Sequence, residues 1–162
     1  MIRRAALAVV LSLAATLGCS QPPSGPRWAL DVAAAHREAD ARVDAGDLTG
    51  ARARLRALVD AQETGSGPPA NPERRLALQD TYFRLSQLAL AAHDPRQALA
   101  DADAGLAFGD APHLFVANLL VARGAAREAV GDPRGAATDY HRALSMNETL
   151  LAAALGRPEP RP

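Results

Sequence analysis

Apolar residues between positions 27 and 155 recur three, four and seven positions apart, which is the period of an amphipathic helix. Glycine, proline and short polar clusters interrupt this pattern. The uninterrupted runs predict six helices at residues 27–45, 48–63, 72–92, 95–107, 112–130 and 133–146, and a short seventh helix at residues 147–155. Alanine, the strongest helix former, supplies much of the apolar content, so we expect an all-α fold.

A turn motif recurs 38 residues apart, as HDPR at residues 93–96 and GDPR at residues 131–134. We expect each Asp carboxylate to cap the next helix and each Pro to take its first position, where a missing N–H costs nothing. His93 and Gly131 would then close the preceding helix in the left-handed conformation. A third copy begins at Gly46, 47 residues before His93.

The longer of the two spacings contains an inserted loop. Residues 64–70 read TGSGPPA, a composition typical of a loop. Asn71 and Pro72 then predict a new helix, with Asn71 as its cap and Pro72 at its first position.

Small residues accompany each turn at fixed distances along the chain. They lie seven residues before the turn (Ala39, Ser86 and Gly124) and five residues after it (Ala51, Ala98 and Ala136). Each copy therefore reads as a helical hairpin whose two helices approach closely. This pattern resembles the tetratricopeptide repeat, a helix-turn-helix unit of about 34 residues. The large aromatic of that family is kept only as Tyr82, with Ala35 and Leu120 in the other copies, and the closing proline is missing.

The resemblance covers most of residues 27–155 and implies a right-handed stack of about three hairpins, with residues 147–155 as a capping helix over the open end. It also implies a groove for a protein or peptide partner, lined by the first helix of each hairpin. Carried over by register, the groove positions are His36, Asp40, Asp44, Phe83, Gln87, Asn118, Val121 and Ala125. Phe83 is the candidate anchor for a partner side chain. Its alternative place is under the 64–71 loop or against the first hairpin.

The N-terminal residues 1–18 combine a basic start with a short apolar run, which is typical of a secretory signal. Cys19, the only cysteine of the chain, follows directly. This arrangement resembles the bacterial lipoprotein signal, although Thr16 and Leu17 are reversed relative to that family's pattern. The resemblance implies that Cys19 is acylated, and Ser20 after it favours the periplasmic face of the outer membrane. The alternative is an ordinary signal cut nearby, which would leave a free thiol.

The remaining segments are short. Residues 19–26 contain three prolines and predict a stiff tether, residues 27–155 form the helical domain, and residues 156–162 predict a disordered tail.

Composition and motifs argue against an enzyme. Formal charge is zero, which disfavours a nucleic-acid surface. The four histidines, at positions 36, 93, 113 and 141, lack metal-ligand spacing, and no phosphate-binding glycine loop or catalytic serine motif occurs. Asp101 and Asp103 could suggest paired carboxylates, but residues two apart point to different sides of a helix, and we expect both on the solvated surface. We expect no cofactor, no metal and no catalytic residue.

The expected function is that of a lipid-anchored periplasmic adaptor that holds a protein or peptide partner at the outer membrane, in envelope, pilus or secretion-system assembly. A solute-binding or purely structural helical lipoprotein is the alternative, although an aromatic content of 4% disfavours a pocket with flat apolar walls. The sequence leaves the partner and the oligomeric state open.

Overall fold

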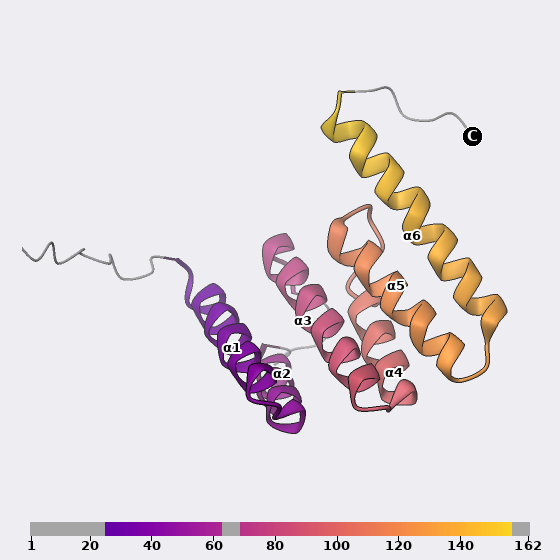
Figure 1. The fold of residues 1–162 in the computed structure, drawn as a ribbon. Helices are drawn as coiled ribbons and strands as arrows, with labels where there is room; N and C mark the ends of the chain where they lie inside the picture. The colour runs from indigo at the N-terminus through magenta and orange to yellow at the C-terminus, as the bar shows by residue number, and fades with distance from the viewer. Residues whose placement is uncertain (1–24, 63–68, 157–162) are drawn as a thin grey trace, which may run out of the picture.

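The computed structural model of the chain describes residues 25–62 and 69–156. These residues form six helices and no strand, as the all-α prediction requires (Figure 1). The helices are α1 (Arg27–Asp44), α2 (Leu48–Gln62), α3 (Pro72–Ala91), α4 (Pro95–Leu106), α5 (Leu114–Ala129) and α6 (Pro133–Ala154). The first five begin and end within two residues of the predicted positions.

The three turns have the predicted backbone conformation. Gly46, His93 and Gly131 have φ angles of 78°, 57° and 87°, and His93 is the one non-glycine residue with positive φ in the described part of the chain. A carboxylate caps each following helix by accepting a backbone N–H: Asp47 from Gly50, Asp94 from Gln97 and Asp132 from Gly135. Asn71 caps α3 in the same way. Local sequence therefore determines where these four helices begin.

The six helices pair into three hairpins, α1–α2, α3–α4 and α5–α6, which are stacked in chain order (Figure 1). The first helices touch one another, α1 with α3 and α3 with α5, and each second helix touches the next first helix. Among the described elements, α6 contacts α5 alone. The third hairpin therefore has a neighbour on one side only.

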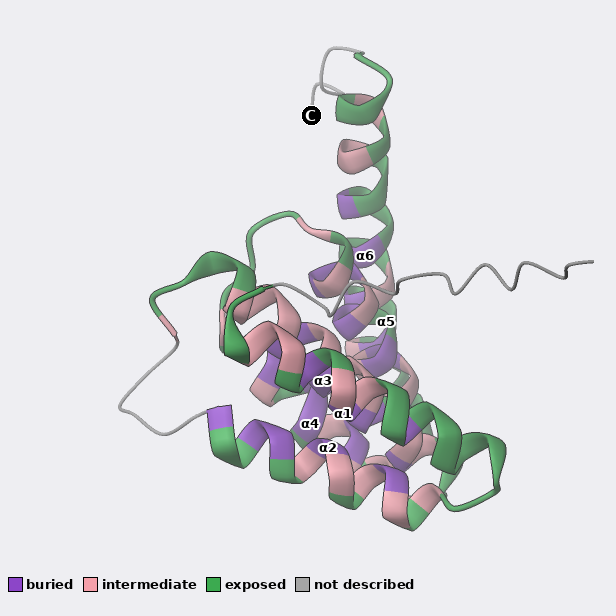
Figure 2. Ribbon diagram, turned by 90° about the vertical axis from the view of Figure 1, so that its left-hand side faces the viewer, coloured by how far each residue is buried: buried purple, intermediate pink, exposed green. Residues whose placement is uncertain are grey.

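The core is built by close approach of small side chains, as predicted. Buried residues lie on the inner faces of the helices (Figure 2). A Cβ atom added to Gly124 would lie 2.5 Å from the ring of Tyr140, and one added to Gly105 would lie 2.8 Å from Tyr82. A larger residue at either glycine would have to displace these neighbouring side chains.

The prediction of a separate helix at residues 147–155 is wrong. α6 runs without a break from Pro133 to Ala154, because residues 145–148 contain no glycine or proline that would end it. Leu150 packs against the cluster of Val116, Ala117 and Leu120 on α5, which holds the last turns in line. The helix therefore extends past the stack instead of folding over its open end (Figure 2).

The prediction that Asp101 is solvated is also wrong, although Asp103 does lie on another side of α4. Asp101 is 1% exposed and forms an ion pair with Arg56 of α2. It also accepts a hydrogen bond of 3.0 Å from Gln97. The helical period of α4 alone could not predict that Asp101 is buried, because the residue that covers it comes from the preceding hairpin.

Candidate partner-binding groove

A solvent-open groove of about 280 Å³ runs between α1 and α3, the first helices of two neighbouring hairpins. Its lining consists of Ala39, Asp40, Val43, Leu55, Asp80, Phe83, Arg84, Gln87 and Leu88. Ala39 is small enough to leave room above Leu55, which reaches the floor from α2 and is buried. Val43 remains 39% exposed at the edge. The groove thus offers an apolar floor with an apolar rim.

Charged side chains fix one border of the groove. Arg84 of α3 donates to Asp80 at 3.2 Å and to Asp40 of α1 at 2.8 Å. Asp40 keeps 61% of its side chain exposed, so it has acceptor capacity left for a ligand. Since Arg84 is held by two carboxylates, this border is ordered before any partner arrives.

His36 connects α1 to α3 beside this border. Its Nε2 lies 2.9 Å from the hydroxyl of Thr81, and that hydroxyl donates to the carbonyl of Ala77. Nε2 therefore carries the proton and donates to Thr81, while Nδ1 lies 3.5 Å from a carboxylate oxygen of Asp80. Burial and the nearby charge of Arg84 lower the pKa of His36, against the opposing effect of Asp80 and Asp40.

A second hollow of about 390 Å³ continues from the groove toward the start of α1. Asp80 lines both hollows, and the contact between His36 and Asp80 separates them. Trp28 and Phe115 contribute aromatic surface to this second hollow from α1 and α5. Two adjoining apolar hollows with a polar divider suit an extended ligand that places side chains at intervals.

The structure brings three of the eight predicted groove residues into the α1–α3 groove: Asp40, Phe83 and Gln87. His36 lines the adjoining hollow. Asp44 is exposed at the end of α1 and lines neither hollow, and Asn118, Val121 and Ala125 lie on α5 outside both. Four of the eight predicted residues thus line these two adjoining hollows, and a role of the eight in partner binding stays a prediction.

Phe83 packs against the first hairpin, which was the alternative prediction, and it also lines the groove. It is half-buried and packs against the cluster that contains Ala39, Leu55 and Leu119. Its remaining surface lines the groove. Val43, Arg84 and Leu88 also line the groove, although they were not among the predicted groove residues. Val43 lies seven positions after His36, so the helical period itself was a usable signal for it.

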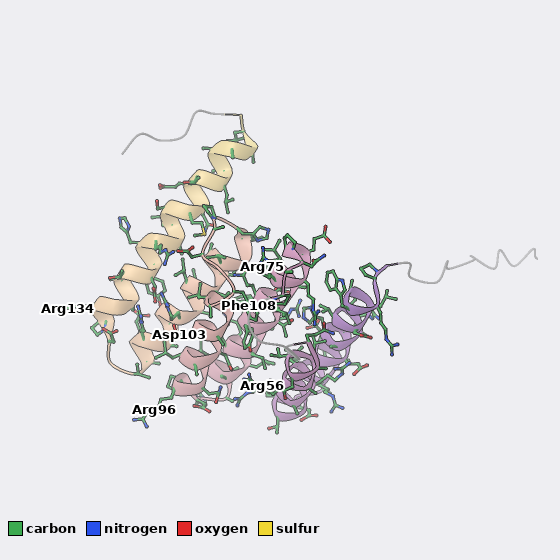
Figure 3. All side chains as sticks on the ribbon, turned by 180° about the vertical axis from the view of Figure 1, so that it is seen from behind. Arg56, Arg75, Arg96, Asp103, Phe108 and Arg134 are labelled. Atoms are coloured by element: carbon green, nitrogen blue, oxygen red, sulfur yellow. The ribbon has the colours of Figure 1, made fainter. Side chains whose placement is uncertain are left out.

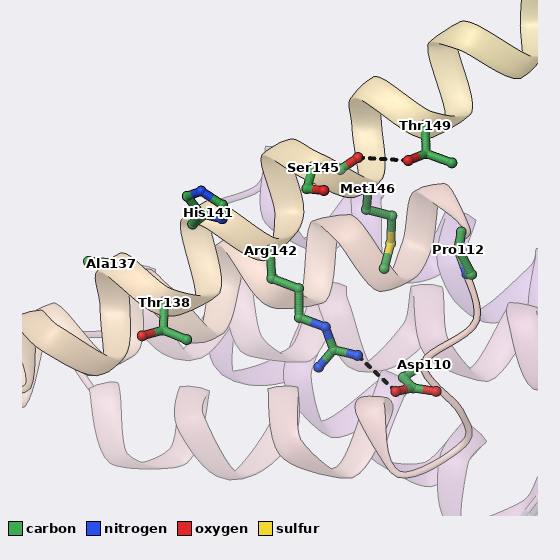
Figure 4. A pocket seen from close by; sticks show the side chains of 9 residues that line it. All are labelled: Asp110, Pro112, Ala137, Thr138, His141, Arg142, Ser145, Met146 and Thr149. Atoms are coloured by element: carbon green, nitrogen blue, oxygen red, sulfur yellow. Dashed lines mark hydrogen bonds and ion pairs between the residues drawn. The ribbon is translucent and has the colours of Figure 1, made fainter. Parts of the chain in front are cut away.

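A larger, shallower hollow of about 790 Å³ lies between α6 and the loop before α5 (Figure 4). Its lining includes Thr138, His141, Ser145 and Thr149 of α6. Arg142 crosses it to pair with Asp110 at 2.8 Å. These polar groups are solvated or already paired, so this hollow offers less for an apolar partner than the α1–α3 groove does.

Other chemistry is sparse in the described part of the chain. No group of three or more His, Cys, Asp or Glu side chains there could hold a metal ion. The labelled arginines in Figure 3, Arg56, Arg75, Arg96 and Arg134, lie on four different helices and form no single basic patch. Within the same residues, no helix has the length and apolar character to span a bilayer. Cys19 and the signal and tether predictions lie outside the described residues.

No protein-family model matches this chain, and neither a curated protein nor a solved structure matches it.

Proposed function

We propose that this chain is a helical-repeat interaction module that binds a protein or peptide segment in the groove between α1 and α3. The observation that carries the proposal is the apolar floor of this groove, open to solvent beside the ordered charges of Asp40 and Arg84. Filling such a floor with one Leu-sized or Phe-sized side chain contributes about 1.5–3 kcal/mol. The exposed carboxylate of Asp40 and the amide of Gln87 would bind polar groups of the same segment.

The module would be attached to the periplasmic face of the bacterial outer membrane by a lipid on Cys19. Support for this part comes from the sequence, in which the sole cysteine directly follows a short apolar run and precedes a proline-rich tether. Such an anchor would keep the groove a short distance from the membrane, where an adaptor for envelope, pilus or secretion-system assembly would act. Replacement of Cys19 by Ala should move the protein from the membrane fraction to the soluble fraction.

Two exposed valines provide a matched test of the groove. Val43 lines the groove and is 39% exposed, and Val130 caps α5 away from the groove and is 40% exposed. Both lie at the end of a helix, where a lysine is compatible with the helix dipole. Val43→Lys should abolish capture of partners from solubilised membranes, as identified by mass spectrometry, while Val130→Lys should retain it. Equal capture by the two variants contradicts the proposal.

A further inference from the structure

Large exposed apolar side chains gather on the third hairpin. In the described chain these side chains are Val43, Leu114, Val121, Val130, Leu144, Leu151 and Leu155. All except Val43 belong to α5, α6 or the residues that end them. The unequal distribution indicates that one end of the stack lacks a cover.

The internal repeat identifies what kind of cover is missing. Counting back 38 residues, the turn-to-turn distance, relates Leu144 to Leu106, Val121 to Phe83 and Leu114 to Leu76. The three residues of the second hairpin are half-buried, and Leu106 packs against the α5 cluster of Val116, Ala117 and Leu120. Their counterparts in the third hairpin are 59%, 43% and 55% exposed. Phe83 and Leu76 face α1 of the preceding hairpin, whereas Leu106 faces the following one. At Leu144, the open end therefore repeats the surface by which α4 binds α5.

The last turns of α6 extend this surface. α6 has 22 residues and α5 has 16, so α6 exceeds α5 by about 9 Å at 1.5 Å per residue. Leu151 and Leu155 lie in this extension and are 59% and 55% exposed. Spacings of seven and four place Leu144, Leu151 and Leu155 on one stripe of the helix. Nothing in the described chain covers that stripe.

We propose that the open end binds the same face of a second copy of this chain, with the two α6 helices antiparallel about a two-fold axis. The stripe is self-complementary in that arrangement. An axis between Asn147 and Glu148 places Leu144 opposite Leu151 of the partner subunit, and Tyr140 opposite Leu155 of the partner subunit. Asn147 then lies opposite the partner subunit's Glu148, which pairs an amide donor with a carboxylate instead of two like charges.

A head-to-tail stack of hairpins does not fit the charges. The opposite end of the molecule is formed by α1 and α2, where the outward positions carry Arg37, Ala41 and the ion pair of Arg54 with Glu38. The single large exposed apolar residue of those helices, Val43, lines the groove. An apolar face against such an end would remove Arg37 and the Arg54–Glu38 pair from water, whereas the same-face pairing buries leucine against leucine. The same-face pairing also stops at a dimer, because in a two-fold interface the same surface of both subunits is buried and none is left for a third copy.

Cross-linking of the full chain in intact membranes tests this arrangement. Glu148→Cys places a thiol beside the proposed axis, and a short bis-maleimide should then yield a covalent dimer of twice the mass of the monomer in the same membranes. The unaltered chain, which carries Cys19 alone, and a Val43→Cys control should yield none. Adding Leu151→Glu to Glu148→Cys should reduce the dimer about tenfold or more, because two carboxylates enter the apolar stripe. Leu151 lies in the extension of α6, so its replacement leaves the core unchanged.

The outcomes separate the possible occupants. Absence of a dimer from Glu148→Cys overturns the proposal. A product of another mass would show that a different protein covers this face, and a dimer insensitive to Leu151→Glu would show that the contact lies elsewhere. Neither result affects partner capture in the α1–α3 groove, which the Val43 and Val130 variants test separately.

Discussion

The second and third hairpins share one sequence pattern but are stabilised differently. Asp101 of α4 and Asp139 of α6 occupy equivalent positions, 38 residues apart, and both are buried. Asp101 pairs with Arg56, which comes from the preceding hairpin. Asp139 pairs with Arg123 and Arg127 of its own hairpin, at 2.6 Å and 2.9 Å. The Asp101 ion pair thus joins the second hairpin to the first, whereas the two Asp139 ion pairs lie within the third hairpin.

The second and third hairpins also differ in the size of the residues at two facing positions. Ser86 and Ala102 of the second hairpin become Gly124 and Tyr140 in the third. Ser86 donates to the carbonyl of Ala98 at 2.9 Å, whereas the ring of Tyr140 lies over Gly124 and its hydroxyl donates to Glu128 at 2.8 Å. Burial, reinforced by that hydrogen bond, raises the pKa of Tyr140 to about 12. Glycine at position 124 therefore leaves the space that the larger Tyr140 ring fills in the third hairpin.

The largest expected effect comes from removing the carboxylate that holds the third hairpin together. Asp139→Ala should lower the free energy of unfolding by about 3 kcal/mol, because Arg123 and Arg127 would lose their shared buried partner. Asp101→Ala should cost about 1 kcal/mol, because Arg56 is 37% exposed and can be solvated instead. Urea unfolding of both variants measures the difference. Equal costs would show that the two ion pairs are equivalent after all.

The turns of the two hairpins provide the next comparison. Gly131→Val should cost about 2 kcal/mol, because a branched residue fits the left-handed conformation badly. His93→Gly should be neutral or stabilising by up to about 1 kcal/mol, since His93 holds a φ of 57° in the same conformation. Thermal midpoints measure both changes. A destabilised His93→Gly variant would mean that the imidazole contributes contacts beyond the turn.

The difference in residue size at these facing positions predicts a smaller effect. Gly124→Ala should cost about 1 kcal/mol, because the displacement of the Tyr140 ring outweighs the better helix propensity of alanine. In the double variant Gly124→Ala/Tyr140→Ala, the added methyl group has no aromatic ring beside it. A double-mutant cycle with Tyr140→Ala therefore isolates the contact, and additive free energies would contradict close packing at this position.

The smallest effect concerns the contact between the first and second hairpins at His36. Because the folded-state pKa of His36 is lowered, the unfolded chain binds more protons as pH falls. Stability from this group is complete above the unfolded pKa of about 6.5 and is lost as pH falls below it. His36→Gln should flatten the pH dependence of the thermal midpoint between pH 5 and 7.5. An unaltered slope in His36→Gln would assign the dependence to another group.

Sequence was sufficient for the three hairpin turns and for the caps of α2, α3, α4 and α6. Proline, asparagine and aspartate at helix starts act within four residues, and so do glycine and histidine at helix ends. The identity of the facing small residues also followed, because helical period places Ala39, Ser86 and Gly124 on one side of their helices. The break predicted before Asn147 was wrong because asparagine permits a helix start without requiring one, and packing of Leu150 on α5 continued the helix.

The tertiary structure decided everything that depends on a neighbour distant in the chain. It buried Asp101 under Arg56 from 45 residues away, and it placed Phe83 half in the core and half in the groove. It also made leucines at equivalent repeat positions differ, with Leu106 covered by α5 and Leu144 exposed at the end of the stack. Sequence period determines which face of a helix is apolar. The order of the hairpins determines whether that face meets protein or water, because each hairpin can bury its forward side only against the hairpin that follows.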